Sequence, residues 1–216
     1  MGCGQSSAPI ADGAKDGKDQ AKIPSKHKKL KPGEIDYKPI HSACRWNTAP
    51  IDEIKKLLNN PKAVACSDPG NGNTPLHIAA QNGHTNIVEI LLGLNAPINV
   101  QNSSGNTPAH MSIEYDYYAT SKMLVDAGAD LEIKNQKDCP AKKGIEGTKN
   151  YMFMPLFDAK TTDEVTKVLD ACLSNISELE KASFAGLGLR SKKSLGPSIW
   201  TDQVQEKFKD ILRQIT

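Results

Sequence analysis

The sequence is poor in aromatic residues and has no long apolar run. Only 5% of its 216 residues are Phe, Trp or Tyr. No stretch approaches the roughly 18 apolar residues that a membrane-spanning helix needs, and the N-terminus lacks the apolar segment of a secretory signal. We therefore expect a chain that neither crosses a bilayer nor is secreted. The hydrophobic content of 38% still allows a modest core, built mainly from aliphatic side chains.

Metal, nucleotide and nucleic-acid motifs are also missing. The five cysteines are widely spaced and include no CxxC pair, which fits a reduced compartment. With 27 basic and 25 acidic side chains, the net charge of +2 gives no reason to expect a nucleic-acid partner. Gly186 and Gly188 lack the GxGxxG or GxxxxGK context of a phosphate-binding loop. We expect no metal, no cofactor and no small-molecule substrate.

Residues 1–38 form a tail with almost no large apolar side chains, so we expect this tail to be disordered. Its first six residues, MGCGQS, put Gly2 directly after the initiator Met and Ser6 at the position that N-myristoylation favours. Cys3, next to Gly2, is available for palmitoylation. One myristoyl chain binds membranes only weakly, at about 10⁴ per molar, so stable anchoring needs a second signal. Cys3 could provide it, as could a basic run attracted to anionic lipid, formed by Lys22, Lys26, Lys28, Lys29 and Lys31.

These features of the tail predict attachment to the cytosolic face of a membrane. The plasma membrane and a ciliary or flagellar membrane are both compatible with the signal. Under the alternative interpretation, MGxxxS occurs by chance, the lysines only solvate a linker, and the protein is cytoplasmic.

Two segments in the middle of the chain repeat at a fixed offset of about 33 residues. NTPLHIAAQNGHTNIVEILLGLNAPINVQN aligns with NTPAHMSIEYDYYATSKMLVDAGADLEIKN. Thr74 can cap a helix whose first turn accepts Pro75, and the small Ala79 and Ala80 let adjacent helices approach closely. A second helix has an apolar face at helical spacing, formed by Ile87, Val88, Ile90, Leu91 and Leu92.

The complete signature TPLHxAA at residues 74–80 and the length of this period resemble the ankyrin-repeat family. The resemblance implies an all-α solenoid of helix-turn-helix repeats that binds other proteins. It also implies that His77, His84 and His110 are structural and hydrogen-bond the loops between repeats.

We expect the repeat domain to span residues 39–150. It would comprise a divergent N-terminal cap at 39–66, clear repeats at 71–134 and a degenerate third repeat at 135–150. In the last of these, the second helix does not arrive where the repeat pattern requires it. The later segment MPLFDAK imitates the signature, so one repeat with an insertion and two damaged repeats both fit.

The C-terminal third is predicted to contain two more helical segments. Residues 151–182 carry one apolar helical face, which either closes the solenoid or binds a partner helix. Residues 183–199 are rich in Gly, Ser and Lys, and this composition predicts a flexible linker. Residues 200–216 form an amphipathic helix that either folds back onto the repeats or presents Trp200 and Phe208 to a partner.

The candidate partner-binding residues come from two arguments. Three tyrosines, Tyr115, Tyr117 and Tyr118, replace a Gly-containing turn, and they either fill gaps against the next repeat or form an exposed contact or phosphorylation site. In ankyrin proteins the loop tips and first helices form the binding face. By position this implicates Asp68, Asn71, Asn73, Gln81, Ser103, Ser104, Asn106 and Ser112.

No set of nucleophile, base or paired carboxylates is recognisable, so we expect no catalytic residue and no enzymatic activity. The sequence favours a monomeric adaptor or scaffold that binds an unidentified protein and is tethered to a membrane by myristate and palmitate. The alternative is a soluble regulatory or inhibitory subunit without an anchor.

Overall fold

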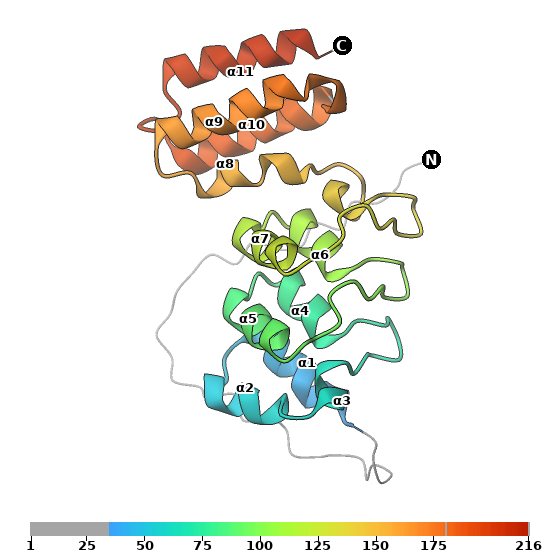
Figure 1. Ribbon diagram of the computed structural model, residues 1–216. Coiled ribbons are helices and arrows are strands. Elements are labelled where there is room, and N and C mark those ends of the chain that lie inside the picture. The colour runs from blue at the N-terminus through green and yellow to red at the C-terminus, as the bar shows by residue number, and fades with distance from the viewer. Residues whose placement is uncertain (1–34, 180, 216) are drawn as a thin grey trace, which may run out of the picture.

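The computed structural model describes residues 35–179 and 181–215, which are almost entirely helical. Within these residues, the only extended pairing is an isolated bridge between Lys134 and Pro140. The helices stack in layers, from α1–α3 at one end of the molecule to α9–α11 at the other (Figure 1). The predicted all-α repeat solenoid is therefore confirmed. The predicted lipidation sites Gly2 and Cys3 and the five tail lysines lie outside the described residues.

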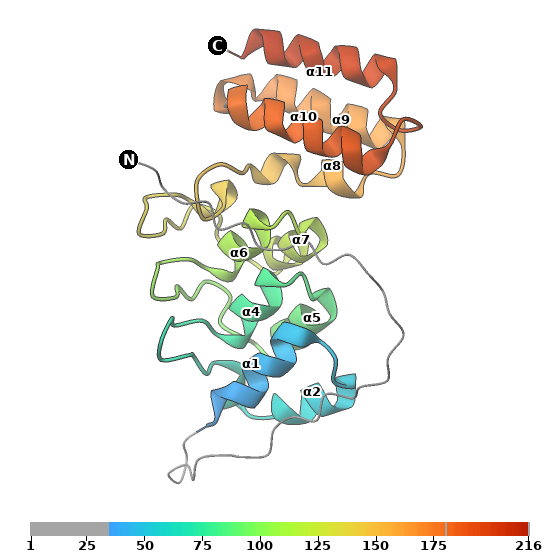
Figure 2. The same cartoon turned by 180° about the vertical axis from the view of Figure 1, so that it is seen from behind.

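Three pairs of antiparallel helices form the first part of the stack. They are α1 (Tyr37–Trp46) with α2 (Ile51–Leu57), α4 (Pro75–Gln81) with α5 (Thr85–Gly93), and α6 (Pro108–Glu114) with α7 (Tyr118–Asp126). The short α3 (Pro61–Val64) follows α2. First helices pack on one another in the order α1, α4, α6, and α5 packs on α7 (Figure 2). Helix α1 begins slightly before the predicted boundary because the Asp36 side chain caps it by accepting from Lys38 N.

The helix starts show why the Thr-Pro-x-His pattern recurs. The Thr107 hydroxyl accepts a hydrogen bond from His110 N, while His110 Nδ1 accepts one from Thr107 N at 3.1 Å. This reciprocal capping satisfies two backbone donors that would otherwise lack partners at the helix start. Thr74 N donates in the same way to His77 Nδ1, at 3.2 Å.

Residues 135–158 form a single third repeat, which corrects the expectation that its second helix is displaced. The 3₁₀ turn η2 (Tyr151–Phe153) begins one repeat period after the start of α7 and is followed by α8 (Pro155–Asp158). Helix α8 packs on α7, so it occupies the position of the second helix in the third repeat. The first helix is reduced to the 3₁₀ turn η1 (Ala141–Lys143), since Gly144 turns the chain away at a φ of 74°. The predicted domain boundary at 150 divides this repeat.

Three longer helices follow and surround a second core. They are α9 (Thr162–Ser174), α10 (Lys181–Leu195) and α11 (Asp202–Gln214), with a 3₁₀ turn η3 (Ile176–Glu178) between α9 and α10. Phe184 stacks on Phe208 with ring centroids 4.3 Å apart, and Trp200 lies 5.7 Å from Phe208. All three side chains are buried.

Two predictions for this region were wrong. Residues 181–195 are helical instead of forming a flexible linker, because burial of Phe184 and Leu187 on one face outweighs the poor helix propensity of Gly and Ser. Helix α11 does fold back, but onto α9 and α10, whereas the sequence had suggested the repeats. Trp200 and Phe208 are core residues, not exposed anchors for a partner.

Candidate protein-binding surface

Three long loops project side by side from the repeat stack (Figure 1). We call them the finger loops, and they comprise residues 67–73, 100–106 and 133–139. Backbone hydrogen bonds join neighbouring loops: Ser103 N donates to Asn71 O at 2.9 Å, and Gln136 N donates to Ser104 O at 3.1 Å. The three loops therefore form one laterally bonded ribbon.

Glycine is required where one finger loop approaches the next. Gly72 and Gly105 occupy equivalent positions with φ of 72° and 77°. A Cβ at Gly72 would lie 2.8 Å from Ser103 N, and one at Gly105 would lie 2.8 Å from Gln136 N. The third loop has Asp138 at this position, also with a positive φ, and no further finger loop follows it in the described part of the chain.

Buried histidines hold the finger loops to the helices. His77 Nε2 donates to Asn106 O at 2.9 Å, and His110 Nε2 donates to Cys139 O at 3.0 Å. Because Nδ1 already accepts from the capping threonine, each ring is a neutral imidazole protonated on Nε2. Burial lowers the pKa of His77 to about 4 and also lowers that of His110. The predicted structural role is confirmed for both, and also for His84, which lies 2.8 Å from Arg45 O through Nε2.

Asparagine side chains add a second ladder inside the ribbon. Asn102 Nδ2 donates to Asn73 Oδ1 at 2.7 Å, and Asn135 Nδ2 donates to Asn106 Oδ1 at 2.8 Å. Asn73 and Asn106 are buried by these contacts. They hold the loops together, so they are not surface residues available to a partner as predicted.

Ser112 is a third predicted contact residue that lies inside the protein. Its hydroxyl donates to Ala109 O at 3.2 Å and accepts from Ser121 Oγ at 2.8 Å. Ser112 and Ser121 stand one repeat period after Ala79 and Val88. A hydrogen-bonded hydroxyl pair therefore replaces an apolar contact between the two helices of a repeat, which keeps both buried hydroxyls satisfied.

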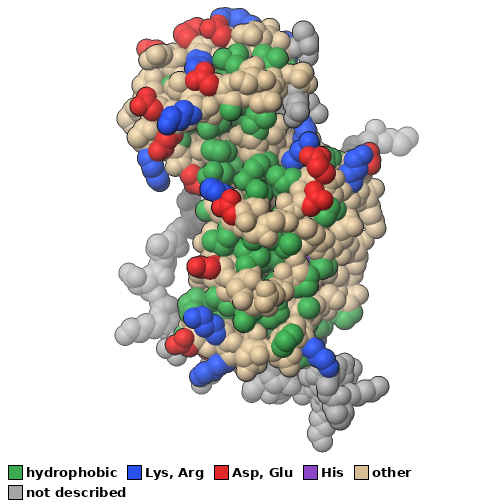
Figure 3. Space-filling model, in the orientation of Figure 1, with side chains coloured by type: hydrophobic (Ala, Val, Ile, Leu, Met, Phe, Trp, Pro, Cys, Tyr) green, Lys and Arg blue, Asp and Glu red, His purple; other side chains and the backbone are tan. Residues whose placement is uncertain are grey.

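The remaining predicted contact residues, four in the finger loops and Gln81 at the end of α4, are at least partly accessible. Asn71, Ser103 and Ser104 are exposed, and Asp68 and Gln81 are half-buried. The sequence interpretation missed the exposed Gln136 and Lys137, which follow Ser103 and Ser104 by one repeat period. Extending the repeat register by one more period would have found them. On the face shown in Figure 3, uncharged side chains cover most of the middle of the stack.

The three tyrosines differ in how far they are exposed and in what they pack against. Tyr115 and Tyr117 are 49% and 38% exposed, and their ring centroids are 6.4 Å apart. Tyr117 also packs across the turn of the preceding repeat, where a Cβ on Gly83 would come within 2.6 Å of its ring. Tyr118 is half-buried. Tyr117 thus fills a gap between repeats while remaining partly accessible beside Tyr115.

The described residues contain no group of three or more His, Cys, Asp or Glu side chains placed to hold a metal ion. Burial raises the pKa of Cys44 and that of Cys172 to about 12, so both thiols stay protonated at neutral pH. No helix in residues 35–179 or 181–215 is long and apolar enough to cross a membrane.

A protein-family comparison agrees with the repeat architecture of the middle of the chain. Residues 40–135, which include most of the predicted cap and both clear repeats, match the family described as "Ankyrin repeats (3 copies)". A similar solved structure is the ankyrin repeat domain of Bcl-3, described as a unique member of the IkappaB protein family. It is 26% identical with a TM-score of 0.45, and the match covers 51% of each chain, so this chain spans about half of that domain. No curated protein sequence gave a significant match.

Proposed function

We propose that this chain, whose middle part consists of ankyrin repeats, is a protein-binding adaptor held at the cytosolic face of a membrane. Ankyrin repeats imply a role in protein interaction. The observation that supports this role most directly is the ribbon of finger loops, in which Ser103 N binds Asn71 O and Gln136 N binds Ser104 O. The ribbon holds exposed polar side chains on a backbone that is already ordered before a partner arrives.

Such pre-ordering favours binding because association otherwise costs free energy for each loop that must be immobilised. Asn71, Ser103 and Ser104 offer short donors and acceptors, which adapt to varied partner groups at little cost in side-chain entropy. Their neighbours in the third loop, Gln136 and Lys137, extend the same surface. We infer that the partner lies across the finger tips of all three repeats.

The membrane part of the proposal rests on Gly2, Cys3 and the basic run in the tail. Two lipid chains, or one chain with a polybasic segment, give the stable attachment that myristate alone does not provide. Confinement to the bilayer raises the effective concentration of the repeats for partners at the same membrane. In this proposal the adaptor acts by bringing its partner and that membrane together.

Intact-mass analysis of the protein from its own cells, with membrane fractionation, tests the anchor. We compare wild type with Gly2→Ala and use Gly4→Ala as the matched control. We expect wild type and Gly4→Ala to carry a myristoyl group and to pellet with membranes, and Gly2→Ala to be unmodified and soluble. A Cys3→Ser variant then shows whether a second acyl chain contributes.

Proximity labelling from the anchored protein identifies the partner. An unmodified, soluble wild type would contradict the anchor and leave the soluble regulatory subunit as the better interpretation. If no protein found by labelling binds to the finger loops, that result contradicts the adaptor role, wherever the protein is located.

A further inference from the structure

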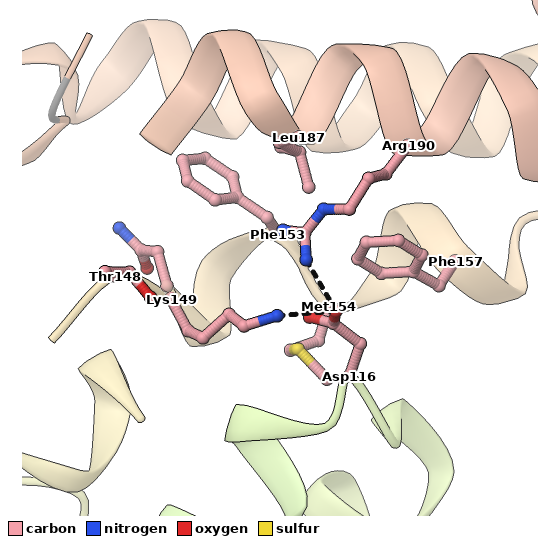
Figure 4. Close-up of a pocket in the computed structure, with 9 residues that line it drawn as sticks. Asp116, Thr148, Lys149, Phe153, Met154, Phe157, Leu187 and Arg190 are labelled. Carbon is pink, nitrogen blue, oxygen red and sulfur yellow. Dashed lines mark hydrogen bonds and ion pairs between the residues drawn. The ribbon is translucent and has the colours of Figure 1, made fainter. Parts of the chain in front are cut away.

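One carboxylate connects the repeats to the C-terminal helices. Asp116, in the turn between α6 and α7, accepts from Lys149 Nζ at 2.7 Å and from Arg190 Nη1 at 2.8 Å (Figure 4). Arg190 lies on α10, 74 residues further along the chain. Its guanidinium also lies over the Phe157 ring, 5.6 Å from the centroid. Arg190 therefore contacts an acid on the repeats and an aromatic ring on α8.

The turn position explains why a carboxylate can stand there. Asp116 adopts a φ of 59° at the place that Gly83 occupies one repeat earlier, and Asp tolerates this left-handed conformation better than most residues. Lys149 follows Asp116 by 33 residues, so it comes from the equivalent turn of the third repeat. The ion pair with Lys149 thus links successive turns, and Arg190 adds a link from outside the repeat pattern.

The two halves of the molecule have separate cores, and they meet near this carboxylate. One core runs through the repeats from Ile40 to Leu124, and the other runs from Phe153 to Ile215. Met154 is buried but belongs to neither core. The cavity beside Asp116 measures only about 10 Å³, barely enough for one water molecule, so the place is a contact between two parts and not a ligand site.

We propose that Asp116, Lys149 and Arg190 form a releasable clasp that holds the C-terminal helices on the end of the repeat stack. Two cations share one carboxylate, and the Asp116 and Arg190 side chains are 22% and 45% exposed. Ions in solution therefore reach the Arg190 bond and weaken it. Lys149 is only 13% exposed, so its bond is screened less.

Opening of the clasp separates α8 from α7, with the connection at residues 144–150 as the joint. This movement uncovers the buried Met154, which immediately precedes α8, and separates the packed surfaces of α7 and α8. The clasp consequently controls access to the surfaces of α7 and α8 that pack on each other at the end of the repeat stack. This proposal is independent of the membrane anchor and of the identity of the partner.

Hydrogen exchange of the full chain, followed by mass spectrometry at low salt and at high salt, tests the clasp. The variants are Arg190→Gln and Asp116→Asn, since Asn keeps the left-handed turn. The matched control is Arg213→Gln, which removes an exposed ion pair with Asp210 inside α11. We expect about tenfold faster exchange in α8 and α7 for both clasp variants at low salt, with α4 and α5 unchanged.

High salt should bring the wild type toward the exchange rates of Arg190→Gln and should change that variant little. The Arg213→Gln control should match the wild type. The effects of Asp116→Asn and Arg190→Gln should be less than additive in the double variant, because both substitutions remove the Asp116–Arg190 bond. Wild-type rates in Arg190→Gln, or equal acceleration in every helix including α4, would overturn the proposal.

Discussion

His77 and Asn106, 29 residues apart, are joined by a hydrogen bond of 2.9 Å from the imidazole Nε2 to the backbone carbonyl oxygen. The same ring accepts from the backbone of Thr74. One side chain therefore caps its own helix and positions the finger loop of the following repeat. His110 repeats this arrangement with Thr107 and Cys139, so the positions of the finger loops depend on two neutral, buried imidazoles.

This arrangement makes the stability of the repeats dependent on pH. The folded-state pKa of His77 is about 4, below the ordinary value of 6.5 expected when the chain unfolds. The unfolded state therefore binds more protons between these values, and the free energy of unfolding falls as the pH drops from 6.5 toward 4. The contribution of the neutral ring is fully present above pH 6.5. At pH 5 the loss from His77 alone should be about 2 kcal/mol, with further loss from His41 and His110, whose pKa values are also lowered by burial.

Urea unfolding at pH 7 and pH 5 measures this loss. The His77→Gln variant should be less stable at pH 7 but should lose about 2 kcal/mol less than wild type on going to pH 5. A pH dependence identical in wild type and His77→Gln would contradict the assignment of a neutral His77.

Gly72→Ala should disrupt the finger ribbon. The substitution introduces both a left-handed alanine and a Cβ at 2.8 Å from Ser103 N, so we expect a loss of about 2 to 3 kcal/mol in the free energy of unfolding. Gly128→Ala is the matched control, because Gly128 also has a positive φ but nothing lies within 4 Å of its Cβ position. It should cost about 1 kcal/mol. Equal losses in the two variants, measured by urea unfolding, would show that the finger loops do not approach this closely.

Ser104→Arg should weaken partner binding without unfolding the protein. Ser104 is exposed, and its backbone, not its side chain, bonds the third finger loop. We expect about tenfold lower affinity for the partner found by proximity labelling, measured by calorimetry, with an unchanged urea midpoint. Glu89→Arg on the exposed side of α5 is the control and should bind normally. Normal binding by Ser104→Arg would place the partner elsewhere on the repeats.

Local sequence patterns predicted the repeat helices well because each pattern acts within a few residues. The Thr-Pro-x-His capping motif, the small alanines and the glycine turns specify a helix pair without distant contacts, as at Thr74 and Gly83. The third repeat was harder to read because Gly144 removes most of its first helix, while its second helix keeps the repeat period.

Burial of polar side chains could not be predicted from position alone. Asn73, Asn106 and Ser112 were predicted from their positions to be exposed contact residues, but each is buried and hydrogen-bonded to another side chain. The partners of Asn73 and Asn106 lie 29 residues away, in the next repeat. A side chain at such a position faces solvent or core according to which residues the neighbouring repeat brings against it.

The sequence by itself determined the register of the two clear repeats, their left-handed glycine turns and the structural histidines, because these depend on backbone conformation and on contacts at one fixed period. Only the tertiary structure decided which segments of the last third of the chain are helical and what they pack against. Phe184 makes a helix of a Gly- and Ser-rich segment by stacking on Phe208, and Arg190 reaches Asp116 across 74 residues. Such contacts follow no period, so they arise only when the packed helices bring distant side chains together.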